Sequence, residues 1–401
     1  MPSSSDRKSL LIILFVFLFV VIGSVVAITV GRGYQVNLKN GLQLKATGLL
    51  SATSVPKGAS VYIDDKLITA TDDTINLPPG SYLIKIVKDG FLPWTKTYQM
   101  KKEVVNQTNA QLFRSVPDLR PLTLSGAINP TISPDLSKLV FAVASASAQK
   151  DNGLYLIDVS DNLISLGRNT PRQLTPNLPG FDWSKAKFTF SPNSRQIIAS
   201  FPTTATNYLI QLDTPISLSN LFDVTVRLPI IQSEWKTQEQ DIIKIRLDRL
   251  PIALKTLVST DSAKNTSFSS SDDKILYLAT INSQLPQDII SPPPAQSTQT
   301  QSRTIIKGNY YVYDLKEDTN FLIGSSSAIT NLSWIPNSNS LVLVENNQIR
   351  AVEYDATNKV TIFGGIFDPS TVFPWADGSK IITLTPPYPS APANLYAISL
   401  K

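Results

Sequence analysis

The chain has 401 residues, a hydrophobic fraction of 42% and a formal charge of +5, and it contains neither cysteine nor histidine. This length accommodates about two to three domains of ~100–200 residues. The two missing residue types exclude disulfide frameworks, Cys-ligated zinc, thiolate nucleophiles and Ser-His-Asp chemistry. Basic residues are scattered, the closest groups being pairs such as Arg7-Lys8, so we expect no nucleic-acid partner. We also expect no cofactor and no bound metal.

The first feature along the chain is an uncharged apolar run from Leu10 to Val30. As a helix, these 21 residues would span about 31 Å, which matches a hydrocarbon core of roughly 30 Å. We therefore predict a transmembrane signal-anchor over residues 10–30, a cytoplasmic leader over 1–9 and a juxtamembrane linker over 31–47. A cleaved signal peptide is the alternative, with a small-residue cleavage site after Ala27.

The flanking charges leave the orientation of this segment open. Basic residues stand on both sides, Arg7 and Lys8 before it and Arg32, Lys39 and Lys45 after it, so the positive-inside rule does not choose. A short leader cannot hold a domain, whereas long domains translocate largely regardless of charge. We expect a single-pass cell-membrane protein with a cytoplasmic N-terminus, an extracytoplasmic body, and the lipid bilayer as the partner of residues 10–30.

Short strands separated by proline and glycine turns extend from Gly48 to Arg114, and we expect strands over residues 49–55, 60–63, 81–87 and 95–100. This region resembles the PEGA domain in four motifs: Pro56 with Gly58-Ala59, Val61-Tyr62-Ile63-Asp64, Pro79-Gly80-Ser81-Tyr82, and Gly90-Phe91. Asp65 stands where many members of that family carry glycine. The resemblance implies a small β-sandwich over residues 48–114 that acts as a surface or periplasmic accessory module without catalytic residues.

From Leu119 onward a unit of turn, strand, loop and second strand recurs. Its five turns are Ser133-Pro134-Asp135, Ser191-Pro192-Asn193, Ser271-Asp272-Asp273, Ile335-Pro336-Asn337 and Trp375-Ala376-Asp377-Gly378. The unit length of about 46 residues suits a propeller blade. The first turn and the strand Leu154 to Asp158 resemble the TolB-like, WD-type repeat. This resemblance implies a β-propeller of five, or alternatively six, blades over residues 119–401, with the strand Leu119 to Leu124 completing the last blade.

Two inserts interrupt the repeats. Residues 230–258 carry apolar side chains at helical spacing and predict a helical insert that Pro251 divides. Residues 283–304 are rich in proline, serine and glutamine, which predicts a disordered loop. In four-stranded antiparallel blades, loops between the second and third strands share a face with the connections between blades. Both inserts are therefore expected on one face, which we take as the binding face.

Few individual residues stand out as site candidates. Trp235 in the helical insert and Tyr388 in the last loop are the candidates for contact with a ligand or partner, although Trp235 can instead pack on the propeller. We interpret Trp334 and Trp375 as core residues. We interpret a set of repeat-equivalent acids as turn caps rather than catalytic carboxylates: Asp135, Asp158, Asp213, Asp314, Asp355 and Asp377.

These features predict a mainly β chain with an N-terminal transmembrane helix, a small PEGA-like sandwich and a propeller. The expected function is that of a non-enzymatic, membrane-anchored binding or scaffolding protein that holds a cell-envelope polysaccharide or protein at the face with the inserts. Two alternatives stay open. One is a propeller-type glycoside hydrolase that uses Asp and Glu only, and the other is a structural cell-envelope component.

Overall fold

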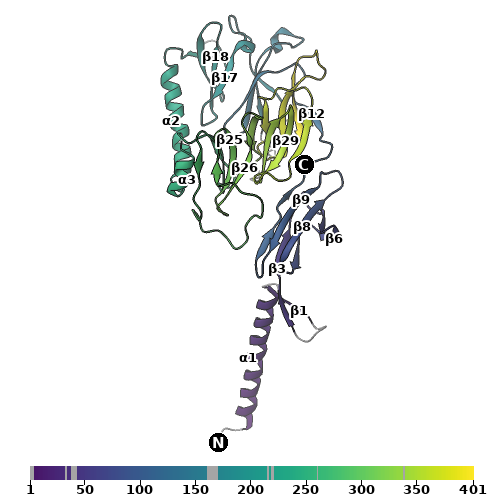
Figure 1. Ribbon diagram of the computed structural model, residues 1–401. Coiled ribbons are helices and arrows are strands. Elements are labelled where there is room, and N and C mark those ends of the chain that lie inside the picture. Colours follow the sequence, from purple (N-terminus) through teal and green to yellow (C-terminus); the bar gives the residue numbers. More distant parts are fainter. Residues whose placement is uncertain are drawn as a thin grey trace. The chain divides into compact units, whose positions relative to one another are not determined.

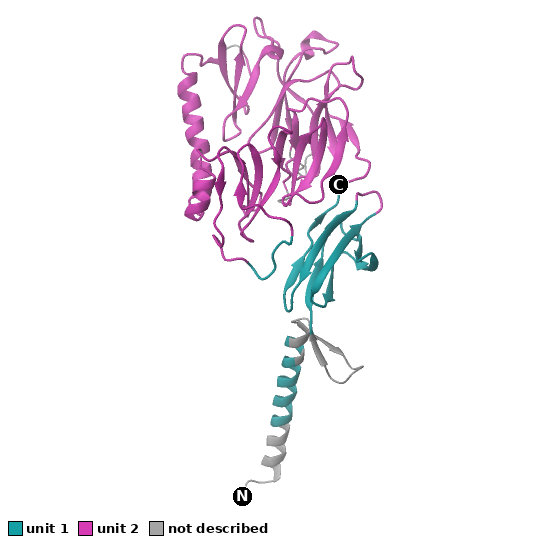
Figure 2. Ribbon diagram, viewed as in Figure 1, with its two compact units in different colours: residues 1–88, 93–112, 293–298 teal, residues 89–92, 113–292, 299–401 magenta. Residues whose placement is uncertain are grey.

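The computed structural model describes residues 4–31, 34–37, 43–159, 170–214, 216–217, 221–259, 261–336 and 339–401. Parts of the expected leader and linker, and Asn337 of the fourth turn, lie outside these residues. The described chain is mainly β and divides into two compact units (Figure 2). Unit 1 comprises residues 1–88, 93–112 and 293–298, and unit 2 comprises residues 89–92, 113–292 and 299–401.

The N-terminal helix α1 spans Ser4–Gly31 and covers the apolar run. Its described side chains, at positions 13–25, 27 and 28, are all exposed, and the large apolar ones among them have exposed fractions from 41% at Val21 to 71% at Phe19. No helix within the described residues meets the length and apolarity that a membrane crossing requires. A hairpin of β1 (Tyr34–Asn37) and β2 (Gln43–Ala46) comes next.

The small β domain of unit 1 consists of two main sheets. The first has the order β6-β5-β8-β9, formed by Lys66–Ala70, Ser60–Ile63, Gly80–Val87 and Trp94–Met100. The second has the order β10-β3-β7, formed by Val105–Gln107, Gly48–Ala52 and Asp73–Leu77, and β11 (Ala110–Gln111) pairs with β4 (Ser54–Val55). Alternating side chains of both sheets are almost fully buried: Leu50, Val61, Ile84, Ile86 and Trp94.

The β5–β6 hairpin shows how the chain tolerates aspartate in a glycine position. Asp64 and Asp65 adopt φ of 47° and 62°, and Ile63 pairs with Lys66, so the two aspartates form a turn of the I′ kind. Asp64 Oδ1 accepts a hydrogen bond from Leu83 N at 3.0 Å. This bond joins the turn to β8, and aspartate tolerates the left-handed region better than most residues.

The proline-rich insert begins and ends in paired strands, β23 (Ser283–Gln284) and β24 (Thr304–Ile305). The structure describes every residue of the insert, and the disorder expected from its composition stays a prediction. Residues 293–298 belong to unit 1. There, Lys101 Nζ donates a hydrogen bond to Pro294 O at 3.2 Å, and Thr298 Oγ1 donates one to Thr97 O at 2.6 Å.

Five four-stranded antiparallel sheets occur among the described residues of unit 2. Sheet 1 is β13 (Ile128–Ile132), β14 (Lys138–Val143), β15 (Gly153–Asp158) and β16 (Arg172–Pro176). Sheet 2 is β17 (Lys187–Phe190), β18 (Gln196–Phe201), β19 (Thr206–Gln211) and β20 (Phe222–Asp223). Sheet 3 is β21 (Ala263–Phe268), β22 (Lys274–Ala279), β25 (Asn309–Asp314) and β26 (Thr319–Ser325). Short 3₁₀ turns, η1 (Gln149–Asp151) and η2 (Trp183–Lys185), lie in the connections.

Sheets 4 and 5 complete the series of four-stranded sheets in unit 2. Sheet 4 is β27 (Ile329–Trp334), β28 (Ser340–Glu345), β29 (Gln348–Glu353) and β30 (Val360–Gly364). Sheet 5 is β31 (Val372–Pro374), β32 (Lys380–Thr385), β33 (Asn394–Ser399) and β12 (Leu119–Pro121). Because β12 pairs with β33, the first strand of the unit completes the last sheet, as the sequence predicts. Successive four-stranded sheets closed in this way are the arrangement of a β-propeller.

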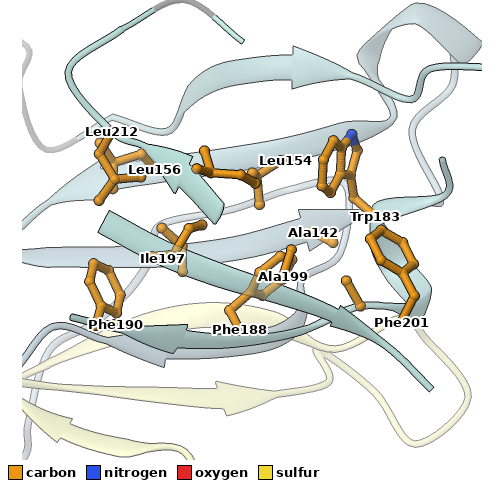
Figure 3. Close-up of a cluster of buried hydrophobic side chains, with 13 residues drawn as sticks. Ala142, Leu154, Leu156, Trp183, Phe188, Phe190, Ile197, Ala199, Phe201 and Leu212 are labelled. Atoms are coloured by element: carbon orange, nitrogen blue, oxygen red, sulfur yellow. The ribbon is translucent and has the colours of Figure 1, made fainter. Parts of the chain in front are cut away.

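Apolar clusters between neighbouring sheets form the core. Sheets 1 and 2 share a cluster that includes Leu154, Trp183 and Phe201 (Figure 3). Trp375 packs with residues of sheets 1 and 5, and Trp334 packs with residues of sheets 3 and 4. Their exposed fractions of 1% and 8% confirm that both tryptophans belong to the core.

One face of sheet 2 packs on sheet 1, and one face of sheet 3 packs on sheet 4. Two helices of the first insert cover the other face of each of these two sheets. Helix α2 spans Leu228–Leu247, and α3 spans Ile252–Leu257 beyond Pro251. Ile231 of α2 packs on Ile198 of sheet 2, whereas Leu254 of α3 packs on Tyr277 of sheet 3. Figure 1 shows α2 running along the side of unit 2 between these two sheets.

Candidate functional site

Two grooves of unit 2 lie where a loop between second and third strands meets a connection between sheets. We name them by one residue each. The Tyr388 groove has a volume of about 370 Å³ and is lined by Leu119, Phe363, Ile366, Thr385, Pro386, Pro387, Tyr388, Pro389 and Tyr396. The Phe181 groove has a volume of about 550 Å³ and is lined by Asn177, Leu178, Gly180, Phe181, Asp182, Lys185, Phe201, Thr203, Thr204, Thr206 and Tyr208.

The Tyr388 groove is aromatic and proline-rich, and none of its lining residues is charged. Tyr388 stands in the β32–β33 loop with 62% of its surface exposed, and Ile366 in the connection after β30 is 59% exposed. The Thr385 hydroxyl donates a hydrogen bond to Ile366 O at 2.5 Å. This bond ties the loop to the connection, so the two walls of the groove are held together.

The Phe181 groove is built on the connection between sheets 1 and 2. Asp182 Oδ1 accepts a hydrogen bond from Ser184 N at 3.1 Å and so caps η2. Trp183, within η2, is buried, and its Nε1 donates a hydrogen bond to Pro176 O at 3.1 Å. Figure 3 shows Trp183 beside Phe201 at one end of the buried cluster, with ring centroids 5.8 Å apart. The groove thus has a rigid aromatic base.

Charge in the Phe181 groove is compensated internally. Lys185 Nζ lies 3.6 Å from Asp182 Oδ2. The Ser184 hydroxyl and backbone N–H, together with the charge of Lys185, hold the pKa of Asp182 below its ordinary value. The carboxylate is therefore ionised at neutral pH and is already paired with the only cation that lines the groove.

The two site candidates named from the sequence lie in different places. Tyr388 lines the groove on sheet 5. Trp235 is half-buried and packs beside Ile231 on sheet 2. A shallow groove of about 580 Å³ runs along the outer surface of α2, but Trp235 is not among its lining residues Pro229, Ile230, Ser233, Glu234, Thr237 and Gln238. The structure does not bring the two candidates into one site.

Sequence reasoning missed Phe181 and Tyr208. A signal was present in Pro179-Gly180-Phe181-Asp182-Trp183, where two aromatic residues flank an aspartate directly after a glycine turn. Gly180 adopts φ of 83°, which favours glycine. The turn carries Phe181 to the same groove as Tyr208 of β19.

The repeat-equivalent aspartates act as turn caps in four of the predicted positions. The backbone N–H two residues further on donates to Oδ1 of Asp135 at 3.0 Å, Asp314 at 2.8 Å, Asp355 at 3.2 Å and Asp377 at 2.8 Å. This is the geometry that aspartate adopts in turns. Among the described residues, no group of three or more acidic side chains has a geometry that suits a metal ion.

Comparison with known proteins supports the small domain directly. The PEGA domain family matches residues 47–115, which confirms the resemblance seen in the turn and strand motifs. No curated protein matches the chain.

Several solved structures resemble the chain. A putative TolB from Agrobacterium tumefaciens has 11% identity and a TM-score of 0.21, over 86% of this chain and 99% of that one. The RRP9 WD40 repeats have 8% identity and a TM-score of 0.31, over 72% and 99%. Pyrococcus horikoshii acylaminoacyl peptidase has 10% identity and a TM-score of 0.21 over 69% of this chain, which spans 38% of the peptidase. Function has to be inferred from this chain's own residues.

Proposed function

We propose that this protein is a non-enzymatic, membrane-anchored, extracytoplasmic binding or scaffolding protein with a five-bladed propeller. One observation carries the proposal: each groove lies between the loop that joins the second and third strands of a sheet and a connection between sheets, which is the face expected to bind. Loops on a rigid sheet scaffold are where binding residues concentrate. The partner is a glycan or a protein of the cell envelope.

The anchor rests on the sequence and on the side chains of α1. Residues 10–30 contain no charge, and the described apolar side chains of α1 are exposed rather than packed in a core. Exposed apolar surface on this scale is unfavourable in water and favourable in lipid. Long domains translocate largely regardless of charge, which favours a body outside the cytoplasm.

The non-enzymatic assignment rests on the acids. A glycoside hydrolase without other catalytic residues needs two free carboxylates separated by roughly 5–10 Å. Four of the repeat-equivalent aspartates are already engaged with backbone N–H groups of their own turns. These contacts favour a structural role for the acids over a catalytic one.

Affinity capture tests binding. The full-length chain, purified in a mild nonionic detergent, is immobilised and exposed to envelope polysaccharides and to solubilised envelope proteins. We expect specific retention of one class, weakened at least tenfold by Tyr388→Ala or by a variant of the Phe181 groove. Phe222→Ala serves as the matched control because Phe222 is 63% exposed on the edge strand β20, outside both grooves. Retention of neither class, or equal loss in the control, would reject the proposal.

Alkaline carbonate extraction of cell membranes tests the anchor separately. An integral protein stays in the pellet, and its N-terminus keeps residues 1–30. Release into the supernatant, or a mature chain that begins after Ala27, would replace the anchor with a cleaved signal peptide.

A structural cell-envelope component is the second candidate, favoured by exposed apolar surface on α2. Ile230, Ile242 and Ile245 of this helix are 55%, 51% and 63% exposed. Self-association through this surface predicts that Ile242→Ser with Ile245→Ser lowers the oligomeric state measured by light scattering. An unchanged mass would remove this candidate.

A further inference from the structure

The Phe181 groove combines a fixed aromatic wall with a hydroxyl-rich wall. Phe181 lies 4.9 Å from Tyr208, with the rings at 74°, and 5.9 Å from the buried Trp183, with the rings at 25°. Phe201, which is 7% exposed, has its ring centroid 5.8–6.0 Å from those of all three rings. Because these rings support one another, Phe181 and Tyr208 keep their positions without a ligand, which reduces the entropy lost on binding.

The groove also offers hydrogen-bonding groups. The β18–β19 loop contributes Thr203 and Thr204, and β19 begins with Thr206; the hydroxyls of Thr204 and Thr206 lie 2.7 Å apart. Among the described residues, neither Thr203 Oγ1 nor the Tyr208 hydroxyl has a hydrogen-bond partner. Asn177 uses its Oδ1 to accept from Trp183 N at 3.3 Å, which leaves its amide nitrogen to donate elsewhere. The groove therefore presents donors and acceptors at fixed positions.

The charge of the groove narrows the ligand class further. Its one cation and its one anion, Lys185 and Asp182, are paired with each other at 3.6 Å. A phosphorylated or uronic ligand needs an uncompensated cation, and a basic ligand needs an uncompensated carboxylate. A ligand that is uncharged, rich in hydroxyls and apolar on one ring face meets no such mismatch.

We propose that the Phe181 groove binds a neutral oligosaccharide, with a pyranose ring against the Phe181 and Tyr208 side and its hydroxyls towards the threonines and Asn177. The volume of about 550 Å³ lies within the range of small-ligand sites. This inference rests on the proposed binding function and specifies its ligand class and its location.

Titration calorimetry with defined oligosaccharides tests the inference on the full-length chain in detergent. The probes are cellohexaose and hexa-N-acetylchitohexaose as neutral chains and hexagalacturonate as an anionic chain of similar length. We expect binding of at least one neutral chain, no binding of hexagalacturonate, and quenching or a shift of tryptophan fluorescence, because Trp183 packs directly against Phe181.

Two variants locate the binding in this groove. Phe181→Ala is expected to weaken binding by about tenfold or more, since it removes an aromatic contact surface. Tyr208→Phe keeps the ring packing and removes only the free hydroxyl, so it decides the question if Phe181→Ala fails to fold. Tyr82→Phe removes a half-buried hydroxyl from β8 of unit 1, outside both grooves, and is expected to leave the affinity unchanged.

The outcomes separate this inference from the proposed function. Absence of neutral-chain binding, tighter binding of hexagalacturonate, or equal effects of Tyr208→Phe and Tyr82→Phe would overturn the inference. If envelope proteins or peptides are captured while every oligosaccharide fails, the binding function stands and the saccharide site does not. If nothing is captured at all, both are wrong.

Discussion

Replacing Arg303 with methionine is expected to lower the free energy of unfolding by about 3–5 kcal/mol. Arg303 Nη2 lies 2.7 Å from Asp318 Oδ2, and the two side chains are 12% and 3% exposed. Arg303 Nη1 also donates a hydrogen bond to Pro286 O at 3.0 Å, and the Tyr313 hydroxyl donates to Asp318 Oδ1. Without the guanidinium, a buried carboxylate keeps only the tyrosine as a side-chain donor.

A double-mutant cycle separates the lost pair from other effects of the substitution. Asp318→Asn removes the charge that Arg303→Met leaves behind, so the double variant is expected to be more stable than Arg303→Met alone. Arg120→Met is the control, because Arg120 pairs with Asp118 at 2.7 Å but is 78% exposed, and such pairs contribute about 0–1 kcal/mol.

Urea unfolding of the full-length variants, followed by circular dichroism, measures each midpoint and slope. The same unfolding curves report on the proline-rich insert, because Arg303 joins residue 286 near the start of that insert to Asp318 in the β25–β26 turn of sheet 3. A loss for Arg303→Met no larger than that for Arg120→Met would refute the reasoning. So would a double variant that is no more stable than the single one.

Three further predictions concern the propeller. Burial alone would raise the pKa of Asp273, but hydrogen bonds from lysine and serine side chains outweigh it and hold that pKa well below its ordinary value. The folded state should therefore lose stability as pH falls below about 4. Asp273→Asn should reduce this loss of stability at low pH, measured as the melting temperature at a series of pH values. Gly153→Ala should destabilise by several kcal/mol, about 2–4, because the added Cβ would meet backbone atoms, whereas Gly364→Ala, whose nearest neighbour is a side-chain atom at 3.8 Å, should shift the midpoint little. Leu254→Ala should lower the free energy of unfolding by about 2–5 kcal/mol, since Leu254 is fully buried, whereas Ile245→Ala should change it little because Ile245 is 63% exposed. Equal shifts in melting temperature for the two glycine variants, or for the Leu254 and Ile245 variants, would contradict the packing described.

The strands that sequence patterns locate well are the two inner strands of each sheet. The strand expected after the turn at residues 271–273 corresponds to β22 (Lys274–Ala279), and that expected after the turn at residues 191–193 corresponds to β18 (Gln196–Phe201). These strands are buried on both faces, so they read as continuous apolar runs. The outer strands β16 and β20 are short or half-exposed, and neither periodicity nor composition distinguishes them from loops.

The candidate site was predictable as a face but not as a set of residues. The strand order alone places the loops between second and third strands on the same face as the connections between sheets. Tyr388 stands out in the sequence as an aromatic residue within Pro386-Pro387-Tyr388-Pro389. The Phe181 groove joins residues 177–185 to residues 201–208. Their proximity depends on the β17–β18 pairing and on the packing of Phe201 against Trp183, which are tertiary contacts that no local pattern encodes.

Helix α2 connects sheets 2 and 3, and these contacts constrain its length more than its sequence. Its first turns pack on sheet 2 through Ile231, and Arg246 near its end lies 3.3 Å from Asp272 of sheet 3. Residues 236–242 between these contacts are exposed, so their side chains are free to vary. One inserted residue, however, would turn the distal contacts by about 100° and shift them by about 1.5 Å. Related chains should therefore tolerate substitutions here far more readily than single-residue insertions or deletions.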